Sequence, residues 1–152
     1  MQALTVAERQ LTASGPTQPV PELSFVRPIP GFTDLRRFAL VRLDTVEATP
    51  VVDGGSPLYE LRSLERTDVR FMMAVPGIYF SDYEIELDDQ ECEDLGLIDS
   101  ADALVLVMLT VGRDAASTTA NLLAPIVINA RSRAAAQVIL TGSDWPVRAP
   151  IG

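Results

Sequence analysis

The sequence predicts an all-β fold, mainly antiparallel, that forms a small β-barrel-like or sandwich domain with one short helix. Three observations lead to this prediction. Short apolar runs of strand length recur between turn signals, the later runs are rich in Val and Ile, and a single segment carries the capping residues of a helix. A chain of 152 residues has the length of one domain with a core of its own.

The amino-terminal part is predicted to contain a short strand near residues 4–7 and then a connector. Ser14–Pro21 holds three prolines and a glycine among polar residues, a composition typical of a loop. Pro28, Pro30 and Gly31 then interrupt an apolar stretch, so residues 23–32 are expected to form an extended bend and no long helix. The expected organisation is an amino-terminal strand and Pro-rich connector over residues 1–22, followed by a single β domain over residues 23–152.

The further apolar runs of strand length are expected to be strands. They are Phe38–Leu43, Leu58–Leu64, Val69–Val75, Tyr83–Leu87, Ala103–Val111, Ile126–Ile128 and Gln137–Leu140. The loop over residues 53–57 and the polar tip over residues 129–133 have the composition of hairpin connections, which predicts antiparallel neighbours. Residues 103–111 are apolar without alternation, so Val105–Val107 with Leu109 are expected in a central strand covered on both faces.

The one helix is predicted over Asp89–Leu95. Asp88 is placed to cap the amides of its first turn, and Glu91 follows three residues later in capping-box position. Acidic residues suit the positive amino-terminal end of a helix, and Gly96 supplies the stop.

The composition excludes several classes of function. The chain has no His and a single Cys, Cys92, so the commonest general base, an intrachain disulfide and Cys-based metal sites are all excluded. We therefore expect no metal and no cofactor. The single thiol indicates a reducing compartment, and the first residues lack the basic start and apolar stretch of a secretory signal. A cytoplasmic location is expected, with no membrane anchor, because the longest apolar run is far shorter than the about 20 residues that span a bilayer.

The charge of the chain indicates the kind of partner it binds. The formal net charge is -9, from 12 basic and 21 acidic residues, and all the basic residues are Arg. A chain of this sign repels phosphate backbones, so no direct binding to nucleic acid is expected. A basic protein partner fits better.

Acidic residues are concentrated between residues 71 and 112, where Lys and Arg are absent. Within this region they alternate with apolar residues. Tyr83, Ile85 and Leu87 are expected to point one way in a strand. The opposite face would carry an acidic stripe, which comprises Asp82, Glu84, Glu86 and Asp88. This stripe is either a docking and steering surface for a basic partner or a solvated strand face that discourages edge-to-edge aggregation.

Catalytic interpretations of the same region are weak. Glu84 and Glu86 could act as a carboxylate pair, but the sequence places no Lys, His or metal-ligand spacing beside them. The acidic residues of the predicted helix lack the loop spacing and central Gly of a calcium site. Cys92 lies among carboxylates, which oppose thiolate formation. The chain is therefore not expected to be an enzyme.

The most distinctive stretch is TTANLLAPIVIN at residues 118–129. Asn121 and Asn129 flank an apolar run that Pro125 begins, which predicts a turn, a strand and a second turn. This stretch resembles the signature of the FliW family. Other segments resemble that family in the same order, namely PIPGF at 28–32, LYELRSL at 58–64, FSDYEIEL at 80–87, LGL at 95–97, VMLTV at 107–111 and QVILTGSDWPVR at 137–148.

The resemblance covers residues 23–148 and implies a small, mainly antiparallel barrel that works as a flagellar assembly factor. It implies two alternating partners, the carboxyl-terminal region of flagellin and the translational repressor CsrA, which binds flagellin messenger RNA. Capture of CsrA would relieve repression of flagellin translation. The candidate partner-binding residues come from the FSDYEIEL and TTANLLAPIVIN segments; they are Phe80, Asp82, Tyr83, Glu84, Glu86, Asn121 and Pro125. Two alternatives remain, a general export chaperone for a secreted substrate and a β-barrel that binds a small apolar ligand.

Overall fold

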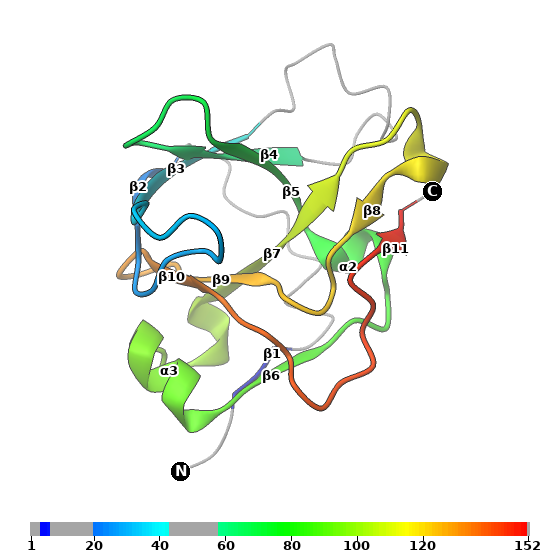
Figure 1. Ribbon diagram of the computed structural model, residues 1–152. Helices are drawn as coiled ribbons and strands as arrows, with labels where there is room; N and C mark the ends of the chain where they lie inside the picture. The colour runs from blue at the N-terminus through cyan, green and yellow to red at the C-terminus, as the bar shows by residue number, and fades with distance from the viewer. Residues whose placement is uncertain (1–3, 7–19, 43–57, 152) are drawn as a thin grey trace.

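A computed structural model describes residues 4–6, 20–42 and 58–151, and it confirms the all-β prediction. Seven strands form a closed barrel. They are β2 (Val20–Phe25), β3 (Arg37–Arg42), β4 (Leu58–Ser63), β5 (Arg70–Ala74), β7 (Ala103–Thr110), β9 (Ile126–Asn129) and β10 (Ala134–Gln137). Figure 1 shows these strands wrapped around a common interior.

The barrel closes because β10 pairs with β2 and β9 pairs with β7. Going round it, β7 pairs with β5, and β4, β3, β2, β10 and β9 follow until β9 returns to β7. All these pairs are antiparallel except β2 with β10, where Ser24 lies opposite Ala134 and Phe25 opposite Ala135. The mainly antiparallel arrangement is as predicted.

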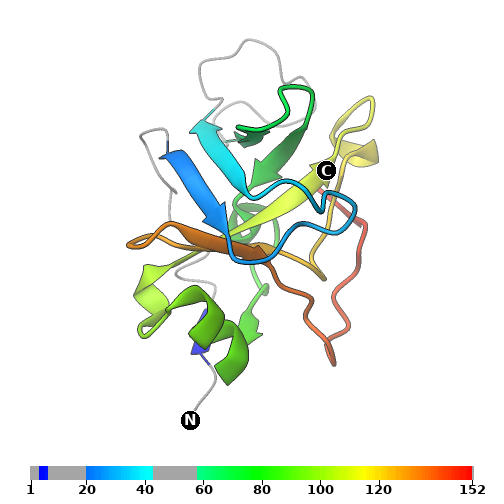
Figure 2. The ribbon, with the colours of Figure 1, turned by 60° about the vertical axis from the view of Figure 1, so that its left-hand side comes forward.

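Short elements lie outside the seven-stranded barrel. Strands β8 (Thr119–Ala120) and β11 (Ala149–Pro150) continue the sheet from the end of β7. Strands β1 (Leu4–Val6) and β6 (Ile85–Leu87) form a separate antiparallel pair. Within the described residues, the helical elements are α2 (Pro76–Tyr79), α3 (Asp89–Leu95) and two 3₁₀ turns, η1 (Ser100–Asp102) and η2 (Ala115–Ser117). Figure 2 shows α3 and the β1–β6 pair together at the lower end of the molecule, below β10.

Apolar side chains fill the interior of the barrel. Because successive side chains of a strand point to opposite faces, each barrel strand sends alternate residues inward. The fully buried members of this inner core include Leu23, Phe38, Leu40, Leu61, Met73, Leu106, Ile126 and Ala135. Phe25 and Phe38 pack edge to face, with ring centroids 5.1 Å apart. The inside of the barrel is thus a packed core.

A second core lies outside the barrel wall. The outward-facing residues of β7, β9 and β10 are covered by β6, α3 and the carboxyl-terminal segment. Strand β7 contributes to both cores, with Leu106 facing inward and Val105 and Val107 facing outward. This confirms the prediction that Val105–Val107 are covered on both faces. Leu109 is only half-buried, because the strand approaches its exposed end there.

The predicted helix is confirmed at its stated bounds. The Asp88 Oδ1 atom accepts a hydrogen bond from the Glu91 backbone N–H at 2.8 Å, and Gly96 ends α3 in the left-handed conformation with φ of 66°. The Glu91 carboxylate pairs with Arg27 Nη2 at 2.6 Å. Because Arg27 belongs to the bend after β2, this pair ties α3 to the barrel. The single turn α2, which begins at Pro76, was not anticipated.

Several predicted boundaries were wrong. Strand β6 begins at Ile85 and not at Tyr83. The last barrel strand is Ala134–Gln137 and not Gln137–Leu140, because the Asn129 Oδ1 atom accepts from the backbone N–H groups of Arg131 and Ser132 and the chain reverses at once. Residues 23–25, which were expected in the bend, belong to β2, and β2 begins at Val20 inside the predicted connector. The remainder of that connector and the predicted hairpin loop over residues 53–57 lie outside the described residues.

Candidate functional site

The predicted acidic stripe lies along β6 and its flanks: Glu86 is in the strand, Glu84 and Asp88 flank it, and Asp82 is in the turn before it. Tyr83, Ile85 and Leu87 are buried in the outer core, with at most 1% of their surface exposed. Asp82, Glu84, Glu86 and Asp88 alternate with them and are exposed, as predicted. The strand lies beside β1, with Glu86 opposite Thr5. The burial of Tyr83, Ile85 and Leu87 therefore leaves the carboxylates that alternate with them exposed to solvent.

No described neighbour neutralises the charge of Asp82, Glu84 and Glu86. Within the described part of the chain, Asp82, Glu84 and Glu86 take part in no ion pair, although Glu91 and Asp94 on the adjacent helix both pair with Arg27. Asp88 uses one oxygen to cap α3. An uncompensated group of exposed carboxylates produces a negative potential that attracts cationic groups.

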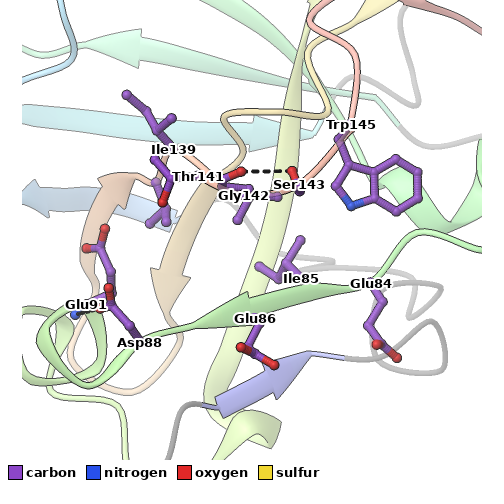
Figure 3. A pocket seen from close by; sticks show the side chains of 12 residues that line it. Glu84, Ile85, Glu86, Asp88, Glu91, Ile139, Thr141, Gly142, Ser143 and Trp145 are labelled. Carbon is purple, nitrogen blue, oxygen red and sulfur yellow. Dashed lines mark hydrogen bonds between the residues drawn. The ribbon is translucent and has the colours of Figure 1, made fainter.

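A groove of about 430 Å³ lies next to the stripe. Strand β6 and the start of α3 form one wall, and residues 138–143 form the other (Figure 3). We call it the β6 groove; it is lined by Glu84, Ile85, Glu86, Asp88, Glu91, residues 138–143 and Trp145. In the loop opposite β6, the Ser143 hydroxyl donates to the Leu140 carbonyl at 2.8 Å, and Gly142 adopts φ of 84°. These features fix a tight turn at the rim.

Tyr83 links the two segments that the sequence singled out. Its hydroxyl donates to the backbone carbonyl of Leu122 at 2.7 Å. Its ring packs edge to face against Trp145, with centroids 4.8 Å apart. Burial raises the pKa of the Tyr83 hydroxyl above its ordinary value, since ionisation would place a charge in the outer core. Tyr83 therefore joins FSDYEIEL to TTANLLAPIVIN from inside the molecule.

The remaining candidates lie in different surroundings. The Asn121 Oδ1 atom accepts from the backbone N–H groups of Leu123 and Ala124, each at 3.1 Å, and shapes the turn before β9. Pro125 is buried, and its carbonyl accepts from the Val138 N–H. Phe80 is half-buried against the outer core. The structure thus gathers Glu84 and Glu86 at the groove, whereas Asn121 and Pro125 are held in a turn and a strand start.

Sequence reasoning missed the wall formed by residues 138–143. It assigned part of this segment to a barrel strand, whose side chains would alternate between core and solvent. Val138 and Leu140 are indeed buried, and their backbone N–H groups donate to the carbonyls of Pro125 and Leu123. Ile139 between them is 57% exposed. The signal available in the sequence was the Thr-Gly-Ser turn directly after this segment.

The described residues contain no group of three or more His, Cys, Asp or Glu side chains placed to hold a metal ion. The Cys92 thiol is half-buried and contacts the Leu87 carbonyl at 3.7 Å. No helix in the same part of the chain is both long and apolar enough to cross a membrane.

Comparison with known proteins identifies the family. The family model described as "FliW protein" matches residues 7–151. The chain is 41% identical over 126 residues to the flagellar assembly factor FliW of Anoxybacillus flavithermus, which covers 83% of this chain and 80% of that protein. It is 33% identical over 124 residues to the flagellar assembly factor FliW of Bacillus subtilis, with 82% and 80% covered.

A solved structure agrees with these matches. The chain is similar to a protein described as "Crystal structure of the flagellar assembly factor FliW", with a TM-score of 0.76 and 35% identity, over 86% of this chain and 85% of that one. The sequence motifs, the barrel and the family model cover nearly the same residues. This chain therefore belongs to the FliW family.

Proposed function

We propose that this protein is a non-enzymatic flagellar assembly factor that acts in the cytoplasm by binding two proteins in turn. One partner is the carboxyl-terminal region of flagellin and the other is the translational repressor CsrA. The proposal is supported by family membership, since the relatives reported above are named flagellar assembly factors. It requires no cofactor and no contact with nucleic acid or membrane.

The observation that carries the proposal is the exposed acidic stripe on β6. A repressor that binds RNA has to present basic side chains to phosphates. Glu84 and Glu86 are exposed and have no cationic neighbour within the described residues, so they can attract such a surface. The net charge of -9 acts in the same direction at longer range and repels RNA phosphates near the complex.

Partner exchange follows from this arrangement. When flagellin accumulates it occupies the factor, CsrA is released and translation of flagellin stops. When flagellin is exported, the factor captures CsrA and translation resumes. Neither step needs a covalent reaction, which agrees with a chain that lacks His.

The packed barrel interior weighs against the small-ligand alternative. A ligand-binding barrel keeps a cavity inside, whereas here apolar side chains from all the barrel strands fill the centre. A general export chaperone differs from the proposal in one respect: it would bind a secreted substrate but would not bind CsrA.

Binding of the purified protein to CsrA and to a flagellin carboxyl-terminal peptide tests the proposal. The variant Glu84→Gln/Glu86→Gln should associate with CsrA several-fold more slowly and with a weaker salt dependence, while dissociation changes little, because exposed charges act mainly on the association rate. The matched control is Asp34→Asn/Glu93→Gln, which removes the same charge from exposed positions outside the stripe. Equal association rates for both variants would contradict the role of the stripe, and no binding of either partner would contradict the function.

A further inference from the structure

We propose that the β6 groove binds an extended, basic peptide segment, which lies alongside the backbone of β6 and places its cationic side chains on the rim carboxylates. The inference deepens the proposed function and rests on it only for the identity of the protein that supplies the segment. It states the chemistry and the conformation of what binds, neither of which the acidic stripe alone provides.

The first argument is the charge of the groove. Glu84, Glu86, Asp88 and Glu91 line it, and none of the described lining residues is basic. Among these four, Glu91 alone forms an ion pair with a described residue, Arg27. Glu84, Glu86 and Asp88 recur on every second residue of β6 and the residues that flank it, so they match cationic side chains on every second residue of an extended chain beside them. Charge complementarity therefore favours a segment with alternating Lys or Arg.

The second argument is the backbone that borders the groove. Within the described residues β6 pairs with β1 alone, so its other edge has no strand beside it. On the opposite wall, Val138 and Leu140 donate their N–H groups to the neighbouring segment. Successive N–H groups of an extended chain alternate in direction, so the Ile139 N–H points the other way, and no described group accepts from it. Backbone groups of this kind are what an added strand uses.

The third argument is the size and the apolar part of the groove. Its volume of about 430 Å³ falls in the range of about 300–1,000 Å³ that is usual for binding pockets. Ile139 is exposed at one wall and Trp145 is half-buried at the end of the groove (Figure 3). These two side chains can contact the apolar residues that alternate with the cationic ones in the segment.

Trp145 provides a direct assay because it is the only Trp of the chain. The probe is a short blocked peptide in which Lys and Val alternate. It should change the fluorescence of Trp145 in a saturable way, and its affinity should fall as salt rises. In Glu84→Gln/Glu86→Gln the affinity should fall about fivefold, as expected for the loss of two exposed ion pairs. The control Asp34→Asn/Glu93→Gln should bind the peptide like the unaltered protein.

Three further peptides test the conformation of the bound segment. A version with Glu in place of Lys should not bind. A version N-methylated at alternate residues loses backbone donors and should bind at least several-fold more weakly. A helical peptide of the same charge should bind more weakly than the extended one. Because these changes are made in the peptide, they leave the folding of the protein untouched.

The inference is overturned if the Lys-Val peptide leaves Trp145 fluorescence unchanged, if the stripe variant and the control bind it equally, or if the N-methylated or helical peptide binds as well as the extended one. Its failure can be told apart from failure of the proposed function. If CsrA and flagellin bind while the peptide does not, the groove inference alone is wrong. If the peptide binds in the groove while neither protein binds, the function alone is wrong.

Discussion

Replacing Tyr83 with Phe removes a single oxygen atom from the outer core, and the structure indicates what this should cost. The Tyr83 hydroxyl donates to the Leu122 carbonyl at 2.7 Å, and Tyr83 has no exposed surface. Without the hydroxyl, this carbonyl has no other donor among the described residues, so the free energy of unfolding should fall by about 1–3 kcal/mol. For a domain of this size the melting temperature should fall by about 2–4 °C per kcal/mol.

The same variant should alter the response to alkaline pH. Burial raises the pKa of Tyr83 above its ordinary value of 10.0, so the unfolded chain loses this proton first as the pH rises. Below about pH 9 Tyr83 is protonated in both states, so its contribution to the free energy of unfolding does not change with pH. Above about pH 10 the folded state holds more protons than the unfolded state, so stability falls by up to about 1.4 kcal/mol per pH unit. The Phe variant lacks this group and should lose stability less steeply there.

Urea unfolding of the unaltered protein, Tyr83→Phe and Tyr83→Leu at neutral and alkaline pH measures both effects. The Leu variant also loses the ring contact with Trp145, so it should be the least stable of the three. The reasoning is refuted if the Phe variant matches the unaltered protein in stability at neutral pH and in its alkaline loss. A Phe variant of unchanged stability that no longer binds CsrA or flagellin would instead make the hydroxyl a partner contact.

Three other predictions concern the cores and the helix. Leu106→Ala truncates a fully buried side chain inside the barrel and should lower the free energy of unfolding by about 2–5 kcal/mol in a urea titration, whereas Val111→Ala, at 47% exposure, should change it by less than about 0.5 kcal/mol. Asp88→Ala removes the cap of α3 and should cost about 0.5–2 kcal/mol in thermal melting followed by circular dichroism; an unchanged melting curve would contradict the cap. Amides of Val105–Val107 should exchange with deuterium far more slowly than those of residues 141–145, and equal rates would argue against a doubly covered strand.

The local signals in the sequence predicted several elements well. Asp88 and Gly96 correctly predicted the two ends of α3, because a capping side chain and a left-handed Gly act on backbone groups only a few residues away. The alternation of apolar and acidic residues around Tyr83 and Ile85 predicted which side of this segment is buried, because side chains of an extended chain alternate between two faces and only one face is buried here. The continuous apolar run in β7 correctly indicated a strand between two cores.

Other features depend on contacts that no local pattern records. Strand β10 consists of Ala134, Ala135, Ala136 and Gln137, residues of low strand propensity, and it is a strand because β2 and β9 flank it. Tyr is a residue type that often anchors interfaces. Here, however, the Tyr83 hydroxyl donates to the Leu122 carbonyl and the ring packs against Trp145. The β6 groove joins β6 to a segment over 50 residues later, as Glu84 and Ile139 show. The two walls of this groove come together because the barrel closes, and the spacing of residues in the sequence does not indicate it.

The parallel pairing of β2 with β10 has a consequence for how the molecule forms. Ser24 and Ala134 can pair only after the whole sequence between them has been made, so ring closure is an event of high contact order. During synthesis the hairpins of β2, β3, β4 and β5 can assemble early, but β2 keeps an open hydrogen-bonding edge until β10 leaves the ribosome. Any interruption of synthesis before Ala134 therefore leaves an open sheet whose inner apolar face is accessible to other nascent chains.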